Sequence, residues 1–333
     1  MNRREFINGT TLATSAALFG VRPSPVAAAE PPPETTTLRL FKTGSICWAP
    51  QYVAEELLRD EGFAHVTYAE IPFGGRVSQH LAAGEADISM NFIAPNLIRL
   101  ELGDPVVFLA GVHVGCFELV GADRVRRIRD LRGKTVAVES LGSPQHVFLA
   151  SIAAYVGLDP QQDIKWSRQP AIESVRLFTE GKVDAFLGFP PQAQELRAKK
   201  IGHVVVNSAT DRPWSQYFCC LVTASREFVR KNPVATKRAL RAILKSADVC
   251  AGEPERAARA LVAKGYTPRF DYALQVMKEL PYGKWREFDP EDTIRFYALR
   301  LHEAGMIKSS PQKIIAQGTD WRFFNELKKE LKA

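Results

Sequence analysis

The stretch GEADISMNFIAP (residues 84–95) and the stretch GKVDAFLGFPP (residues 181–191) follow one plan. Each has a glycine, an aspartate three residues later, an apolar run typical of a β-strand, and then a proline. Gly181 and Asp184 lie 97 residues after Gly84 and Asp87. A glycine can end a helix in the left-handed conformation, and an aspartate can open the strand that follows. We predict that both stretches are structural turns into the last strand of a repeated unit, and that neither aspartate is catalytic.

The segments before these turns repeat the order strand, helix, strand, helix, strand. Apolar patterning predicts the first set at LRLFK (38–42), APQYVAEELLRDEG (49–62), HVTYAEI (65–71), GGRVSQHLAAGE (74–85) and ADISMNF (86–92). The second set is GKTVAVE (133–139), SPQHVFLASIAAYVGL (143–158), DIKWSRQ (163–169), AIESVRLFTEG (171–181) and VDAFLGF (183–189). The strand starts are 95 to 98 residues apart. We therefore expect an α/β protein with two βαβαβ units, whose parallel strands direct their carboxyl ends toward one crevice.

The first 29 residues have the pattern of an export signal. Arg3 and Arg4 are adjacent, a mildly apolar stretch follows, and three alanines end at Ala29. Paired arginines before such a stretch are typical of the bacterial twin-arginine route, which exports folded proteins. We predict that residues 1–29 are a twin-arginine signal peptide, that the mature chain begins near Glu30, and that it lies in the periplasm.

Charge and cysteine content argue against several other classes. Removal of residues 1–29 takes away three arginines and one glutamate, which lowers the formal net charge from +7 to +5. The densest basic run, RVRRIRDLRGK (124–134), lacks interleaved aromatic residues, so we expect no nucleic-acid partner. The five cysteines are odd in number, and neither they nor the histidines show metal-ligand spacing. We therefore expect no disulfide framework, no metal and no cofactor.

Several motifs make the chain resemble the periplasmic solute-binding proteins of ABC importers, in the family of nitrate, taurine, alkanesulfonate and thiamine-precursor binders. The resemblance covers residues 38–325 and rests on LLRDEGF, LAAGEADIS, IRDLRGKTVAVESLGSPQHVFL, YVGLDPQQDI, LFTEGKVDAFLGFPPQ and SREFVRKNPVATKRALRAILKSADV. It implies a two-lobed, type II binding protein that closes by a hinge on one small molecule and docks on a membrane permease as a monomer. Lobe 1 would comprise residues 38–113 and 210–333, and lobe 2 residues 114–209. Strands at 106–121 and 204–223 would connect the lobes, and the C-terminal helices would pack mostly on lobe 1.

Candidate solute contacts lie in the loops after the predicted strands. In lobe 1 these are Ser45 and Trp48 in TGSICWAP, Gly75 and Arg76 in FGGRVS, and Asn91 in NFIAP. A glycine-rich helix start favours an anion, and an arginine beside it can add a bidentate contact.

In lobe 2 the strongest local signal is the loop ESLGSPQH, in which Ser140, Gly142 and Ser143 lead into a helix. Gln192 follows the last strand of that lobe, and His113 and Tyr217 lie on or near the connecting strands. Two helix starts facing one crevice favour an anionic headgroup. The aromatic side chains Trp48, Phe92, His113, Phe117, Trp214 and Tyr217 favour an organic anion, a sulfonate or carboxylate, over nitrate.

Three alternatives stay open on the sequence. The solute could be a pyrimidine of the thiamine-precursor kind, or the protein could serve a sensor in place of an importer. The same fold also hosts desulfinases that use a cysteine after the first strand, where Cys47 lies. Against an enzyme, the desulfinase order Arg-Gly-Gly is here Gly74-Gly75-Arg76, and YFCCLV lacks the longer cysteine cluster of pyrimidine synthases. We expect a binding protein and no catalytic residue.

Overall fold

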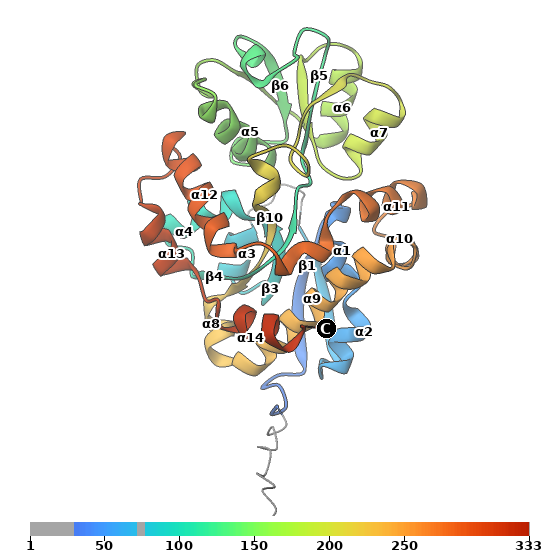
Figure 1. Cartoon of the computed structure of the whole chain (residues 1–333), viewed down its shortest axis with the longest axis vertical. Helices are drawn as coiled ribbons and strands as arrows, with labels where there is room; N and C mark the ends of the chain where they lie inside the picture. The colour runs from blue at the N-terminus through green and yellow to red at the C-terminus, as the bar shows by residue number, and fades with distance from the viewer. Residues whose placement is uncertain (1–29, 72–76, 333) are drawn as a thin grey trace, which may run out of the picture. The chain divides into compact units, whose positions relative to one another are not determined.

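The computed structural model of the chain describes residues 30–71 and 77–332. Residues from Pro32 onward form one compact unit of mixed helices and strands (Figure 1). The predicted signal peptide, Gly75 and Arg76 lie outside the described residues. No helix among the described residues is long and apolar enough to cross a membrane.

The six strands predicted for the two repeated units are all present. The strands are β1 (Thr37–Lys42), β2 (His65–Glu70), β3 (Ile88–Phe92), β4 (Val106–Val114), β5 (Glu118–Gly121), β6 (Thr135–Val138), β7 (Lys165–Arg168), β8 (Ala185–Gly188), β9 (His203–Asn207) and β10 (Phe218–Ser225). The α-helices are α1 (Ala49–Tyr52), α2 (Glu55–Asp60), α3 (Val77–Ala82), α4 (Ile93–Glu101), α5 (Pro144–Tyr155), α6 (Ala171–Thr179), α7 (Gln192–Ala198), α8 (Arg226–Lys231), α9 (Pro233–Gly252), α10 (Pro254–Ala263), α11 (Phe270–Glu279), α12 (Pro290–Glu303), α13 (Pro311–Gly318) and α14 (Arg322–Glu330). Short 3₁₀ helices include η1 (Ile46–Trp48) and η3 (Trp214–Gln216).

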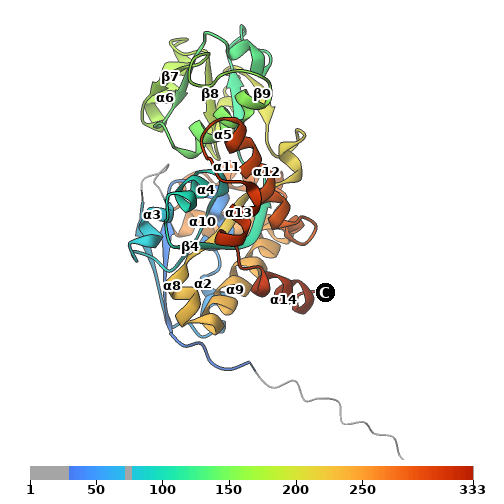
Figure 2. The ribbon, with the colours of Figure 1, turned by 90° about the vertical axis from the view of Figure 1, so that its left-hand side faces the viewer.

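The strands form three sheets. β1 and β2 pair in parallel, β10 lies antiparallel between β3 and β4, and the five-stranded sheet has the order β7-β6-β8-β5-β9. In the five-stranded sheet, β6 is parallel to β7 and β8, whereas β5 runs antiparallel to β8 and β9. Figure 1 shows this sheet gathered with α5, α6 and α7, and Figure 2 shows β7, β8 and β9 beside α6.

The two Gly–Asp turns have the structural role that the sequence predicts. Gly84 and Gly181 have φ angles of +73° and +70°, which a residue with a Cβ adopts only with strain. Asp87 accepts the backbone N–H of Arg39 on β1 at 2.8 Å, and Asp184 accepts that of Thr135 on β6 at 2.7 Å. Each carboxylate therefore fixes the third strand of its unit beside the first.

Each predicted connecting strand is broken at the crossing between the sheets. β4 ends at Val114 and β5 begins at Glu118, while β9 and β10 are separated by residues 208–217. Gly115, between β4 and β5, has a φ of +69°, and a Cβ there would lie 2.4 Å from the Cα of Ala209. The two crossings are tied together because the Ser208 hydroxyl accepts the N–H groups of Cys116 (3.1 Å) and Phe117 (2.9 Å). The two backbones thus approach each other closely just after β4 and β9 end.

The C-terminal helices pack largely on the sheets that hold β1 to β4. α9 contacts α1, α2 and β4, and α13 and α14 also reach β4. Two helices contact the elements of the five-stranded sheet: α12 packs on α5, and α11 on α7.

Candidate functional site

One pocket is lined by loops that follow strands of two sheet systems. The first system comprises the sheets of β1 to β4 and β10, and the second is the five-stranded sheet. Its empty volume, with the open mouth included, is about 950 Å³. Its walls are Thr43, Ser45, Cys47, Trp48, Ile71, Val77, Asn91, Phe92, Pro95, Asn96, Ile98, Arg99, Leu102, Cys116, Phe117, Gly142, Pro144, Phe189 and Cys220. Four predicted contact residues, Ser45, Trp48, Asn91 and Gly142, are in this set. The pocket therefore lies at the carboxyl ends of parallel strands, where open α/β sheets bind ligands.

Asn91 and Asn96 belong to a buried hydrogen-bond network in the pocket wall. The Asn96 side-chain amide donates to Asn91 Oδ1 at 2.6 Å and to the Phe92 carbonyl at 2.5 Å. Asn96 Oδ1 accepts the Ser78 N–H at 3.2 Å and also contacts the Ser78 hydroxyl. Asn91 Nδ2 donates to the Ser89 carbonyl at 3.3 Å. Because an NH₂ group carries two donors, one donor of Asn91 has no partner among the described residues.

Thr43 offers a polar group that the sequence did not single out. Its Oγ1 is shielded from solvent and has no hydrogen-bond partner in the described structure, yet the residue lines the pocket. The Tyr52 hydroxyl holds the Thr43 backbone in place, accepting its N–H and donating to its carbonyl at 3.1 Å each. A buried hydroxyl without a hydrogen-bond partner destabilises the folded protein unless a ligand supplies the missing partner.

The pocket walls carry little charge. Arg99 is the one basic side chain among the described lining residues, and none of them is a carboxylate. Arg99 is paired with Asp104, with Nη2–Oδ1 and Nε–Oδ2 distances of 2.7 and 3.0 Å. The described walls therefore offer no acidic group that could pair with a cationic solute, and this disfavours such a solute only weakly.

Aromatic rings form much of the apolar wall. Phe92 and Phe117 meet edge to face with ring centroids 4.9 Å apart, and Phe117 stacks on Phe148 at 5.0 Å. Trp214 and Tyr217, predicted to supply aromatic surface, instead contact Phe296 outside the lining, at 5.5 and 3.9 Å.

The start of α5 uses most of its own N–H groups. The Gly142 N–H donates to His146 Nδ1 (3.1 Å), the Ser143 N–H to the Ser140 carbonyl (3.2 Å), and the His146 N–H to the Ser143 hydroxyl (3.3 Å). Burial lowers the pKa of His146 to about 4, so it is neutral at pH 7. Pro144 has no N–H, and the Gln145 N–H has no hydrogen-bond partner among the described residues.

The remaining predicted contact residues lie apart from the lining. Ser140 is exposed, Ser143 caps α5 from a buried position, and Gln192 is the half-buried first residue of α7. His113 is fully buried on β4 and is not itself a lining residue.

Burial also changes the protonation of Glu139 and of Cys47, of which Cys47 lines the pocket. It raises the pKa of Glu139, at the end of β6, to about 7, so this carboxyl is partly neutral at physiological pH. It raises the pKa of the Cys47 thiol well above the ordinary value. Cys47 is therefore an uncharged thiol at pH 7.

Solved structures with this architecture have the periplasmic-binding-protein fold. The nitrate-binding protein NrtA from Synechocystis PCC 6803 matches with a TM-score of 0.77 and 16% identity, over 91% of this chain and 90% of that one. The alkanesulfonate-binding protein SsuA from Xanthomonas axonopodis pv. citri, bound to MOPS, matches at 0.67 and 16%, over 88% and 100%. The desulfurization enzyme DSZB matches at 0.59 and 14%, over 88% and 99%. At these identities the matches establish the fold, and they confirm the predicted α/β binding-protein architecture.

The family follows from the sequence itself. Residues 31–265 match the model of the NMT1-like family, and the chain belongs to that family. No curated protein sequence matches the chain.

Proposed function

We propose that the chain is the solute-binding component of an ABC importer and captures a small organic anion, a sulfonate or carboxylate, in the pocket. The observation that carries the proposal is the composition of the pocket. It is lined from both sheet systems, has no carboxylate among its described lining residues, where the one arginine, Arg99, is paired with Asp104, and presents the hydroxyl of Thr43 without a partner in the described structure.

The apolar walls favour an organic solute over a bare inorganic anion. Phe92, Phe117 and Trp48 line the same space as the polar groups, so carbon atoms of a solute would replace water against them. Burial of apolar surface contributes about 25 cal/mol per Å², which nitrate cannot gain. A pyrimidine would meet the same walls, and it therefore belongs in any ligand panel.

We further propose that residues 38–113 with 210–333, and residues 114–209, act as two lobes that close on the solute. Two backbone crossings at 115–117 and 208–217 join the two sheet systems, and hinges of this kind absorb the rotation in binding proteins. Away from the crossings, Glu279 at the end of α11 accepts hydrogen bonds from Arg197 (2.6 Å) and Gln194 (3.0 Å) of α7. These polar contacts would separate when the lobes open.

The same proposal includes the compartment and the partner. Residues 1–29 would export the chain to the periplasm, where a monomer would deliver the solute to a permease. Replacement of Arg3 and Arg4 by lysine should then retain the precursor inside the cell.

The neutral state of Cys47 makes the enzyme alternative less favourable. A desulfinase-like mechanism needs a reactive cysteine, and reactive cysteines have lowered pKa values. Burial raises the pKa of Cys47 instead.

A ligand panel tests the function directly. Thermal unfolding is measured with sulfonates, nitrate, pyrimidines and aromatic carboxylates, because a ligand at a hundred times its dissociation constant stabilises the folded protein by about 2.7 kcal/mol. Small-angle scattering with the best ligand then measures closure, and calorimetry compares the parent with Arg76→Ala. We expect an organic anion to bind, the radius of gyration to fall, and Arg76→Ala to lose roughly ten- to more than a hundredfold in affinity. Tight binding of a cation would refute the ligand class, and an unchanged radius would refute the hinge.

A further inference from the structure

Four cysteines and one histidine meet where β4, β10 and the loop after β1 reach the pocket. They are Cys47 on η1, Cys116 at the first crossing, Cys219 and Cys220 on β10, and His113 on β4, and all five are buried. Three of the thiols, those of Cys47, Cys116 and Cys220, also line the pocket. The proposed solute chemistry gives this cluster no task.

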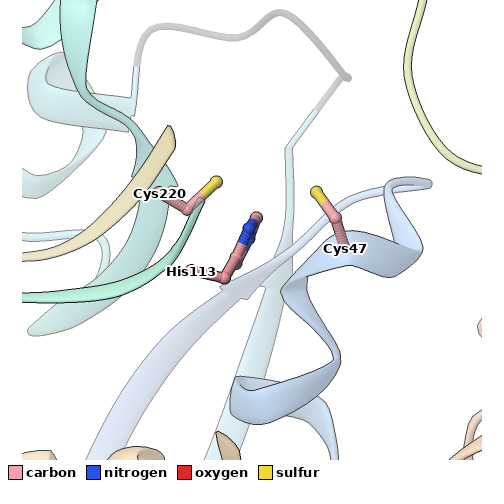
Figure 3. Close-up of side chains that lie close together, drawn as sticks. All are labelled: Cys47, His113 and Cys220. Carbon is pink, nitrogen blue, oxygen red and sulfur yellow. The ribbon is translucent and has the colours of Figure 1, made fainter. Parts of the chain in front are cut away.

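Three of these side chains are arranged as metal ligands. Figure 3 shows Cys47, His113 and Cys220 pointing toward one another from three different segments. Their sulfur and nitrogen ligand atoms all lie within 4.8 Å of one another. A tetrahedral zinc ion with Zn–S bonds of about 2.3 Å holds two sulfurs roughly 3.8 Å apart, so side-chain shifts of about 1 Å would complete the geometry.

His113 is already oriented for coordination. Its Nδ1 lies 3.3 Å from the Val114 carbonyl and 3.1 Å from the Gly115 carbonyl. A carbonyl only accepts, so Nδ1 carries the proton and Nε2 presents a lone pair. Nε2 is buried and has no hydrogen-bond partner in the described structure. Histidines that bind metals typically donate one ring N–H to a group such as a backbone carbonyl and coordinate the ion through the other nitrogen.

We propose that Cys47 Sγ, Cys220 Sγ and His113 Nε2 bind one Zn²⁺ ion, with the fourth coordination position open to the pocket. Thiolate and imidazole are ligands of soft and borderline metal ions, and two cysteines with one histidine are an established zinc donor set. Two thiolates, a neutral imidazole and Zn²⁺ sum to zero charge, which suits a site buried among apolar side chains. Binding of the ion lowers the pKa of the two thiols, which release their protons to the solvent. This proposal does not depend on the identity of the solute.

The other two thiols fit a supporting role better than a second site. Cys116, Cys219 and Cys220 also bring their sulfurs within 4.8 Å of one another, and the sulfurs of Cys116 and Cys219 are 2.7 Å apart. Three thiolates with Zn²⁺ would leave a buried net negative charge. We therefore assign Cys116 and Cys219 as neutral thiols that hydrogen-bond to each other beside Cys220.

Metal titration of the reduced, purified protein tests the site. Co²⁺ is added first, because thiolate-to-cobalt charge transfer and the visible bands of tetrahedral Co²⁺ report both ligand type and geometry. Zn²⁺ then displaces it. We expect one ion per chain. Cys47→Ser, Cys220→Ser and His113→Gln should each lower the Zn²⁺ affinity more than a hundredfold, since even the outer partners of metal ligands contribute about 10- to 100-fold.

The chain supplies matched controls. Cys250 is equally buried but lies on α9 outside the cluster, so Cys250→Ser should bind Zn²⁺ like the parent. Cys219→Ser should retain binding within about tenfold. Circular dichroism checks that each variant is folded, and zinc X-ray absorption of the parent gives the sulfur and nitrogen count even if a variant fails to fold.

Several outcomes would overturn the proposal. These are the absence of stoichiometric binding, unchanged affinity in Cys47→Ser, and loss of binding in Cys219→Ser with retention in Cys47→Ser. Uptake of Cu⁺ without uptake of Zn²⁺ would overturn the choice of ion.

Discussion

The two repeated units join their first and third strands differently. In the five-stranded sheet, β6 and β8 pair backbone to backbone, with Val136 opposite Ala185 and Ala137 opposite Phe186. In the other unit, the side chain of Gln51 lies between β1 and β3. Its Nε2 donates to the Phe41 carbonyl of β1 at 2.6 Å, and its Oε1 accepts the Met90 N–H of β3 at 2.6 Å.

The two units also differ in the polar residues that they contribute to the pocket. The segments after β1 and β3 supply Thr43, Ser45 and Cys47 on one side and Asn91 and Asn96 on the other. Among the described lining residues, the loops of the five-stranded sheet contribute Gly142, Pro144 and Phe189. The Gln51 amide, in place of a direct strand pair, joins the carboxyl ends of β1 and β3. The repeat thus provides the frame, and the polar lining groups gather on the unit that departs from it.

Gln51→Leu should have the largest effect on stability. Leucine fills a similar volume but leaves the Phe41 carbonyl and the Met90 N–H buried without partners. Each such group costs about 1–3 kcal/mol, so we expect the free energy of unfolding to fall by about 4 kcal/mol in urea denaturation. Exposed Gln162→Ala is the control, with a change within about 0.5 kcal/mol. A loss below 1 kcal/mol in Gln51→Leu would mean that β1 and β3 can pair without the amide.

The aspartates of the Gly–Asp turns occur in both units, and their replacement should give equal and smaller losses in the free energy of unfolding. Asp87→Ala and Asp184→Ala each remove a charged acceptor from a strand N–H, together with an ion pair to Arg39 or Arg124. Because the paired arginines are half exposed, the N–H bond dominates, and we expect a loss of about 2 kcal/mol for each variant at pH 7.

The pH dependence of Asp184→Ala distinguishes this contribution from packing. Burial acts to raise the pKa of Asp184, but the Thr135 N–H and Arg124 outweigh it and the net pKa is lowered. A lowered pKa means that the contribution is present above the unfolded value near 4 and is lost as the pH falls through the folded value. The parent and Asp184→Ala should therefore converge in stability in acid. A difference that persists there, or a change in solute affinity in either variant, would contradict a purely structural role.

The sequence predicted the frame better than the site. Glycine, aspartate and alternating apolar residues act locally, so the turns at Gly84 and Gly181 and the six strands could be located. The broken crossings could not, because they depend on Gly115 meeting Ala209, 94 residues away along the chain. The thiol cluster could not be predicted from the sequence for the same reason. Cys47, His113 and Cys220 have no ligand spacing in the sequence, and only the packing of β4, β10 and η1 brings them together.

The smallest predicted effect comes from a comparison of the loops that follow the first strand of each unit. Thr43 follows β1 and Ser140 follows β6, but only Thr43 lines the pocket, and its Oγ1 lacks a partner in the described structure. Thr43→Val removes a buried hydroxyl that forms no internal bond, so the stability without solute should stay equal or rise by up to about 1 kcal/mol. If that hydroxyl bonds the solute, affinity should fall about 2- to 13-fold, the equivalent of 0.5–1.5 kcal/mol. Ser140→Ala, in an exposed position, should leave both quantities within twofold. Calorimetry with the best ligand and urea denaturation without it measure the two quantities independently. A role limited to folding would lower stability and affinity together in Thr43→Val, whereas a loss of affinity confined to Ser140→Ala would place the solute against the five-stranded sheet instead.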